Sequence, residues 1–305
     1  MREDTRKMPD IKLFSTNGKV QELNSSKVLL EKELQNLIEQ NMETFFGVRF
    51  LKSEYTILNG RMDSIGIDEN NSPVIFEYKR SNNENVINQG LFYLDWLLDH
   101  KADFKLLVLE KLGMDMAENI DWSVPCVICI ANDFTKYDVH AVNQMQRNIK
   151  LVKYRKYGEE LILFEHLNVP NVKPVQIEDI SSTNKKSSGQ KSHLEKLTTL
   201  SKEMRTLYDS ICDFIESLGD DIVANQLKLY LAYKKVQNFV CIEVYSKQII
   251  LELKIQPDSV PLEEGFSRDM RGIGHYGTGD LQVSIKNEVD FERAKPLLER
   301  AYHEA

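Results

Sequence analysis

The stretch GRMDSIGIDENNSPVIFEYKR, residues 60–80, decides the fold of the first half of this chain. Two runs of strand-forming residues, 60–67 and 74–80, flank a turn-rich segment at 68–73, which predicts an antiparallel hairpin. With the turn centred near residue 70 or 71, Asp63 and Glu77 are neighbours across the hairpin, where Cβ atoms lie about 5 Å apart. Lys79 comes two residues after Glu77 and projects from the same face. We therefore expect these three side chains to converge.

Two carboxylates this close repel each other, so one is protonated unless a cation neutralises both. Mg²⁺ fits such a site because it binds one or two carboxylates together with waters and phosphate oxygens, and Mn²⁺ is the alternative cation. The backbone carbonyl of Tyr78 is a further candidate ligand. Lys79 is a candidate for orienting or deprotonating an attacking water. The pattern indicates metal-assisted hydrolysis of a phosphodiester.

The competing interpretation is a solvated strand, because Glu and Lys two residues apart are common on exposed faces. Against it, the apolar residues 74–76 lead directly into Glu77, as they do in a buried strand. Charged side chains on a buried strand need partners, and Asp63 lies across the hairpin. This context favours a functional site.

The segment resembles the PD-(D/E)XK nuclease motif, with Asp63 as the first acid and residues 77–79 as the E-x-K element. A helix expected at 84–99 carries Gln89 and Tyr93, four residues apart on one helix face, which resembles the Q-x-x-x-Y element of one large branch of that superfamily. The resemblance implies a restriction-endonuclease-like mixed sheet flanked by helices, with Gln89 and Tyr93 as positioning residues. The structural alternative is a core tyrosine and a surface amide.

Upstream, EKELQNLIEQNMETFFG (31–47) is similar to the first helix of NucS-type (EndoMS-type) endonucleases, and residues 29–100 carry the match. This resemblance implies that Glu31 completes the metal site; Glu33, Glu39 and Glu43 are competitors for that role. It also implies DNA as the partner and leaves open a homodimer. NucS proteins have a separate N-terminal domain that this chain, with about 25 residues before the helix, does not match, so mismatch specificity is not implied.

The chain divides at residues 179–193, a polar Ser-, Lys- and Asn-rich segment typical of linkers. The division predicts an α/β nuclease-like domain at 1–178 and an α+β domain at 194–305, in line with about 150 residues per domain. In the first domain we expect a hairpin around Asn17–Gly18, helices from 27, from 84 and after 138, and strands at 104–109, 124–131, 151–155 and 161–164. In the second we expect helices at 204–218 and 290–302, with strands at 230–236, 239–244, 249–255 and 281–285.

The C-terminal part resembles a widespread uncharacterised domain sometimes labelled a predicted transport protein. The matching pieces are LAYKKVQNFV (231–240), the pair at 268–269 and GHYGTGD (274–280). Its candidate ligand-binding residues are Lys234, Arg268, His275 and Asp280. The alternative is that the glycines of this segment only form turns. The transport label has no support, since the sequence has neither a P-loop nor a membrane segment.

Composition and charge bound the function further. The 305 residues contain 39 Lys and Arg against 47 Asp and Glu, a net charge of −8, which argues against constitutive coating of nucleic acid but not against a local basic groove. The longest apolar run, 124–131, is far shorter than the ~20 residues of a membrane span. Four cysteines without a zinc pattern favour a reducing cytoplasm; Cys126 and Cys129 are expected to face opposite sides of a strand.

Basic residues are candidates for phosphate contacts beside the metal site. They are Arg61, Arg80, Arg147, Lys150 and Lys153. The alternative for the last three is a solvated strand face. Taken together, the sequence predicts a two-domain, Mg²⁺-dependent deoxyribonuclease. The rival hypothesis is a non-catalytic nucleic-acid or protein-binding scaffold that keeps a nuclease fold.

Overall fold

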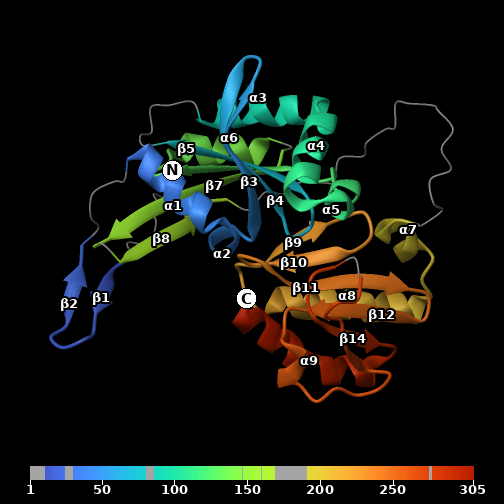
Figure 1. The fold of residues 1–305 in the computed structure, drawn as a ribbon. Coiled ribbons are helices and arrows are strands. Elements are labelled where there is room, and N and C mark those ends of the chain that lie inside the picture. Colours follow the sequence, from blue (N-terminus) through green and yellow to red (C-terminus); the bar gives the residue numbers. More distant parts are fainter. Residues whose placement is uncertain are drawn as a thin grey trace, which may run out of the picture.

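The computed structural model describes residues 11–24, 30–79, 86–145, 147–158, 160–168, 191–274 and 277–305. Two six-stranded sheets, each with its own core, account for most of this chain, and a two-stranded hairpin lies apart from both (Figure 1). That hairpin, β1 (Leu13–Ser15) and β2 (Gln21–Leu23), is antiparallel and turns through Gly18 at φ 86°, as the Asn-Gly sequence predicts.

The first sheet is mixed, with the order β3-β4-β5-β6-β7-β8. Its strands are β3 (Val48–Ile57), β4 (Gly60–Asp68), β5 (Pro73–Lys79), β6 (Cys126–Ala131), β7 (Ile149–Tyr157) and β8 (Leu161–His166). The neighbours β5, β6 and β7 are parallel, whereas the remaining pairs are antiparallel. Strand β6 is apolar on both faces, as is typical of a parallel strand covered from both sides.

Helices cover both faces of this sheet. One face packs on α3 (Val86–Asp99), α4 (Lys101–Leu112), α5 (Met114–Glu118) and α6 (Lys136–Gln144). The opposite face packs on α1 (Glu31–Gln40) and α2 (Met42–Phe46). Cys129 belongs to the first core and Cys126 to the second, so the two thiols face opposite sides of β6 and cannot share a metal ion, as expected.

One local prediction is wrong, and one strand was not predicted. Residues 104–109 form part of helix α4 rather than a strand, because Phe104, Leu107 and Val108 are buried at helical spacing while the intervening side chains point outward. The sequence reading also missed strand β3, whose pairing with β4 shifts register between Phe50 and Lys52. A bulge of this kind breaks the two-residue alternation by which a strand is recognised.

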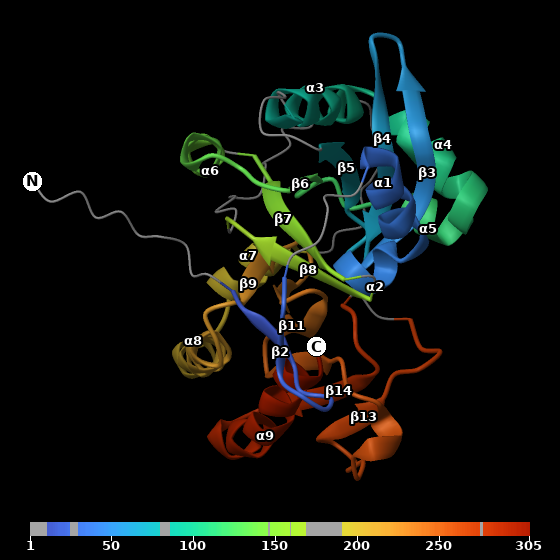
Figure 2. The ribbon, with the colours of Figure 1, turned by 90° about the vertical axis from the view of Figure 1, so that its left-hand side faces the viewer.

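The second sheet is antiparallel throughout, with the order β13-β14-β12-β11-β10-β9. Its strands are β9 (Val223–Gln226), β10 (Leu231–Lys234), β11 (Asn238–Tyr245), β12 (Gln248–Leu253), β13 (Ser267–Asp269) and β14 (Leu281–Ile285). Helices α8 (Lys202–Ser217) and α9 (Glu288–Glu304) cover one face; the short helices α7 (His193–Thr198) and η1 (Pro257–Ser259) lie outside the sheet. Figure 2 shows α8 and α9 on the side away from the first sheet.

The other face of the second sheet meets the first domain. Tyr230, Ala232 and Cys241 form a small core on this face, and side chains around it bond to the turn between β4 and β5. A cavity of about 270 Å³ lies between the domains, lined by Glu43, Gly47, Arg49, Glu69, Gln237 and Thr278. Most of the predicted linker, 179–190, lies outside the described residues. No helix in the described part of the chain is long and apolar enough to cross a membrane.

Candidate active site

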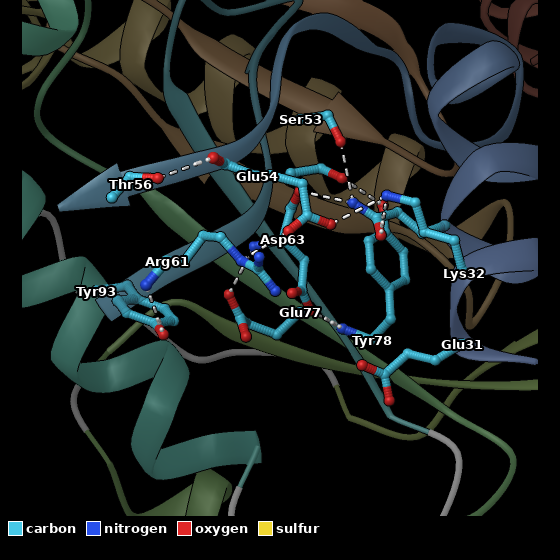
Figure 3. A network of polar contacts seen from close by, with 12 residues as sticks. Glu31, Lys32, Ser53, Glu54, Thr56, Arg61, Asp63, Glu77, Tyr78 and Tyr93 are labelled. Carbon is cyan, nitrogen blue, oxygen red and sulfur yellow. Dashed lines mark hydrogen bonds and ion pairs between the residues drawn. The ribbon is translucent and has the colours of Figure 1, made fainter. Parts of the chain in front are cut away.

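The hairpin of β4 and β5 positions the two acids. Ser64 pairs with Phe76 in the antiparallel register, so the next residues along, Asp63 and Glu77, are opposite each other on the same face. The side chains take the place of regular backbone bonds here: Asp63 Oδ2 accepts a hydrogen bond from the Tyr78 amide at 3.0 Å, and Glu77 Oε1 accepts one from the Asp63 amide at 3.3 Å. Figure 3 shows the two carboxylates between the strands.

Burial dominates the electrostatics of this pair. Glu77 is 2% exposed, and its burial, followed by the negative charge of Asp63, raises its pKa to about 9. Burial also raises the pKa of Asp63, although the Tyr78 amide and the charge of Lys79 act in the opposite direction. The pair therefore holds a proton near neutral pH unless a cation compensates both charges.

Lys79 and Glu31 lie beside the acids. Glu31 is the first residue of α1, and its carboxylate is 3.8 Å from the ammonium group of Lys79, whose side chain is largely buried. The negative charge of Glu31 reaches both Asp63 and Glu77. The four predicted residues are thus brought together, with Glu31 paired to the lysine.

The competitors of Glu31 have other partners. Glu33 accepts a hydrogen bond from the Leu30 amide and so caps the start of α1. Glu39 accepts one from the Ser64 hydroxyl at 2.6 Å. Glu43 is on α2 and lines the cavity between the domains, where its backbone carbonyl accepts a hydrogen bond from the Gln237 side chain.

A polar network behind the site ties α1 to the hairpin. The amide of Gln35 donates to the Asp63 carbonyl at 2.8 Å and to Glu39 at 2.9 Å. The Ser64 hydroxyl accepts a hydrogen bond from the buried phenol of Tyr78 at 3.1 Å and donates a hydrogen bond to the carboxylate of Glu39. Sequence reasoning missed Gln35, although its spacing of four residues from both Glu31 and Glu39 places all three on one helix face.

Glu54 is a second residue that sequence reasoning missed. It belongs to β3, has φ 51°, and lies between the pairs Ser53–Ser64 and Tyr55–Met62, hence opposite Asp63. Its carboxylate forms ion pairs with Lys32 at 3.0 Å and Arg61 at 2.6 Å. No motif marked it, because the strand that carries it was not recognised.

Of the two residues predicted on helix α3, Tyr93 contacts the hairpin. The phenol of Tyr93 is buried and accepts a hydrogen bond from the Arg61 amide at 3.3 Å, a contact visible in Figure 3. The ring also fills the space where a Cβ at Gly60 would lie, so that position has no room for a side chain. Gln89 is exposed to solvent on the same helix.

The basic candidates occupy different places. Lys153 is in register with Ala131, which is in register with Lys79, so both lysines lie on one face of the sheet, about 10 Å apart across two strand spacings. Lys153 is 8% exposed and pairs with Asp133 at 2.5 Å.

The other basic candidates differ in their surroundings. Lys150 faces the opposite side of the sheet near Asp68 and Lys234, where burial lowers its pKa. Arg61 is exposed, Arg147 lies half-buried before β7, and Arg80 is outside the described residues.

The C-terminal candidates do not form one site. Lys234 is buried and pairs with Glu69 of the first domain at 3.2 Å. Arg268 is exposed on β13, with its guanidinium beside the sulfur of Met270, and the side chain of Asp280 is exposed before β14. His275 lies outside the described residues.

A divalent metal fits the donor set in part. Asp63 and Glu77 offer hard oxygen ligands whose raised pKa values signal uncompensated burial. Among the residues that the structure describes, no three or more Asp, Glu, His or Cys side chains are grouped to hold a metal ion. Further ligands would have to be waters, backbone carbonyls or phosphate oxygens, which Mg²⁺ accepts.

Comparisons with known proteins give matches to parts of the chain. Residues 192–305 match a domain of unknown function, DUF5655. Among solved structures, a repair endonuclease from Pyrococcus abyssi is 20% identical with a TM-score of 0.28, covering 43% of this chain and 50% of that one. An EndoMS–double-stranded DNA complex is 20% identical with a TM-score of 0.26, covering 43% and 48%. The match therefore spans about half the length of these two structures.

An uncharacterised protein from Haemophilus influenzae matches over nearly its whole length. It is 30% identical over 302 residues, which cover 95% of this chain and 99% of the relative. The chain therefore belongs to the family of this Haemophilus influenzae protein.

Proposed function

We propose that this protein is a metal-dependent nuclease that hydrolyses phosphodiester bonds in DNA, with a restriction-endonuclease-like first domain. One observation carries the proposal: Asp63 and Glu77 face each other in a buried hairpin with Lys79 beside them. Burying two neighbouring carboxylates without a cation lowers the stability of the fold. Such pairs are common at functional sites, where the charge is used.

The residues divide the work as follows. Asp63 and Glu77 would hold the metal, with Glu31 and the Tyr78 carbonyl as candidate additional ligands. Mg²⁺ or Mn²⁺, when bound, supplies Lewis-acid polarisation of the phosphate and lowers the pKa of a bound water. The ammonium of Lys79 orients the attacking water or offsets negative charge on the phosphate. Gln35 and Tyr93 hold β4 in place from opposite sides.

We infer that basic side chains near the site contact the phosphate backbone. Lys153 lies on the same sheet face as Lys79, where it is 8% exposed and paired with Asp133. Arg61 is exposed three residues before Ser64 and adds positive charge near the hairpin. Such contacts position a nucleic acid without reading its sequence.

The second candidate function is a binding scaffold. Its specific support is the ion pair between Glu31 and Lys79, which occupies both a candidate ligand and the candidate catalytic lysine. In this hypothesis the hairpin keeps its architecture but turns over no substrate.

The decisive experiment is incubation of the purified chain with circular, linear and single-stranded DNA, each with Mg²⁺, Mn²⁺ or EDTA. The nuclease hypothesis expects metal-dependent cleavage that Glu77→Gln abolishes and Glu118→Gln, the same change at an exposed carboxylate, leaves intact. Calorimetric titration with Mg²⁺ separates the two hypotheses when no cleavage is seen: the scaffold hypothesis expects no binding that depends on Glu77.

A further inference from the structure

The turn between β4 and β5 is built to present two side chains outward. Asp68 Oδ1 accepts hydrogen bonds from the amides of Asn70 and Ser72, both at 2.9 Å, and Asn71 adopts a left-handed φ of 61°. These bonds fix the turn from within. They leave the carboxylate of Glu69 and the amide of Asn70 without partners inside the turn, pointing to the C-terminal domain.

The C-terminal domain supplies four donors to these two groups. Glu69 Oε1 accepts from the Lys234 ammonium at 3.2 Å and from the Asn238 backbone amide at 2.6 Å. Asn70 Oδ1 accepts from the Tyr230 phenol at 3.1 Å and from the Asn238 side-chain amide at 2.5 Å. One carboxylate and one amide are thus each held by two donors from the other domain.

These donors are buried and held in place. Asn238 has no exposed surface, and Tyr230 and Lys234 are each 6% exposed. Asn238 also donates to the Thr278 hydroxyl at 3.1 Å, which fixes the orientation of its side chain. A buried ammonium needs a partner, and Glu69 is the carboxylate that pairs with it here.

We propose that Tyr230, Lys234 and Asn238 form a receptor for the acidic turn at Glu69–Asn70, and that the C-terminal domain thereby clamps the hairpin that carries Asp63 and Glu77. Glu69 lies six residues after Asp63 and eight before Glu77. Because β4 and β5 are paired, holding the turn also holds the two acids in register. The effect on cleavage rests on the proposed nuclease function, whereas the clamp itself does not.

The clamp also gives the C-terminal domain a role in this chain. Its face opposite α8 and α9 is a docking surface for the first domain, and Lys234 serves that surface rather than a free ligand. The two domains are then coupled through the metal-site hairpin, independently of the segment that joins them along the chain.

The test is a double-mutant cycle in the full chain, using Glu69→Gln, Lys234→Met and the double variant. Hydrogen exchange measured by mass spectrometry should report on peptides from β4–β5, with peptides from β7 in the same sheet as an internal reference. Glu69→Gln leaves Lys234 as an uncompensated buried charge, so exchange in β4–β5 should accelerate about 10- to 100-fold. The double variant should exchange more slowly than Glu69→Gln alone, because it removes that charge.

A matched pair provides the control. Lys105 and Glu118 form an exposed ion pair within the first domain at 3.2 Å, so Lys105→Met and Glu118→Gln make the same chemical changes away from the interface. These variants should leave exchange in β4–β5 within about twofold of wild type. Tyr230→Phe removes a single hydrogen bond to Asn70 and keeps the test available if Glu69→Gln does not fold; it should accelerate exchange about fivefold.

The outcomes separate the clamp from the nuclease function. Selective acceleration in β4–β5, with rescue in the double variant, supports the clamp, and a parallel fall in DNA cleavage supports its role in positioning the acids. If the variants show this selective acceleration but the wild-type protein cuts no DNA, the result supports the clamp and counts against the nuclease function. Exchange unchanged in Glu69→Gln and Tyr230→Phe, or additive effects in the cycle, would overturn the clamp.

Discussion

Replacing Glu77 by Gln should make the metal-free protein more stable at alkaline pH. In the folded protein, burial and Asp63 raise the pKa of Glu77 to about 9, while the unfolded chain has the ordinary value of 4.5. Folding therefore takes up a proton between these values, and the free energy of unfolding falls as pH rises through this window. Gln has the shape of the protonated acid and never ionises, so the variant lacks this loss.

The magnitude follows from the linkage. One proton bound only in the folded state changes the free energy of unfolding by about 1.4 kcal/mol per pH unit. Between pH 6 and pH 8 the wild type should lose about 2.7 kcal/mol relative to Glu77→Gln. For a 305-residue chain that unfolds as one unit, this corresponds to a relative fall in Tm of roughly 4 °C.

The assay is thermal unfolding followed by circular dichroism at pH 6, 7 and 8 in EDTA, for wild type, Glu77→Gln and the exposed control Glu118→Gln. Saturating Mg²⁺ should restore stability to the wild type at pH 8, because a metal binds the deprotonated acids, and should have little effect on Glu77→Gln. Parallel pH profiles for wild type and Glu77→Gln in EDTA would refute the claim that this carboxyl is buried without compensation.

Three further predictions concern the neighbours of the acids. Lys79→Ala should lower the cleavage rate about 10²–10⁴-fold while DNA affinity in Ca²⁺ stays near wild type, because the ammonium acts mainly in the transition state; a matching loss of affinity would contradict this. Gln35→Ala removes the hydrogen bond to the Asp63 carbonyl and should cost about 1–3 kcal/mol in urea unfolding, together with weaker Mg²⁺ binding; unchanged Mg²⁺ affinity by calorimetry would show that Gln35 does not position the acid. Tyr93→Phe keeps the ring against Gly60 and loses one hydrogen bond, so it should cost about 1 kcal/mol and less than tenfold in cleavage; abolished cleavage in a folded variant would give the phenol a direct role instead.

The sequence by itself determined the hairpin that carries the acids. Strand-forming runs on either side of a turn fix the register, because a slip of one residue would move every side chain to the other face. The register puts Asp63 opposite Glu77, and the apolar residues before Glu77 indicated that the strand is buried. These features are local, so a single sequence carries enough information to predict them.

Only the tertiary structure decided what surrounds the hairpin. The apolar run in α4 fits a strand as well as a helix until its packing is known, and the bulge hid β3 together with Glu54. Gln35 reaches Asp63 across 28 residues, and Lys234 reaches Glu69 across 165. Contacts between residues so far apart depend on how complete elements pack, and no spacing within the sequence specifies which buried charge will meet which partner.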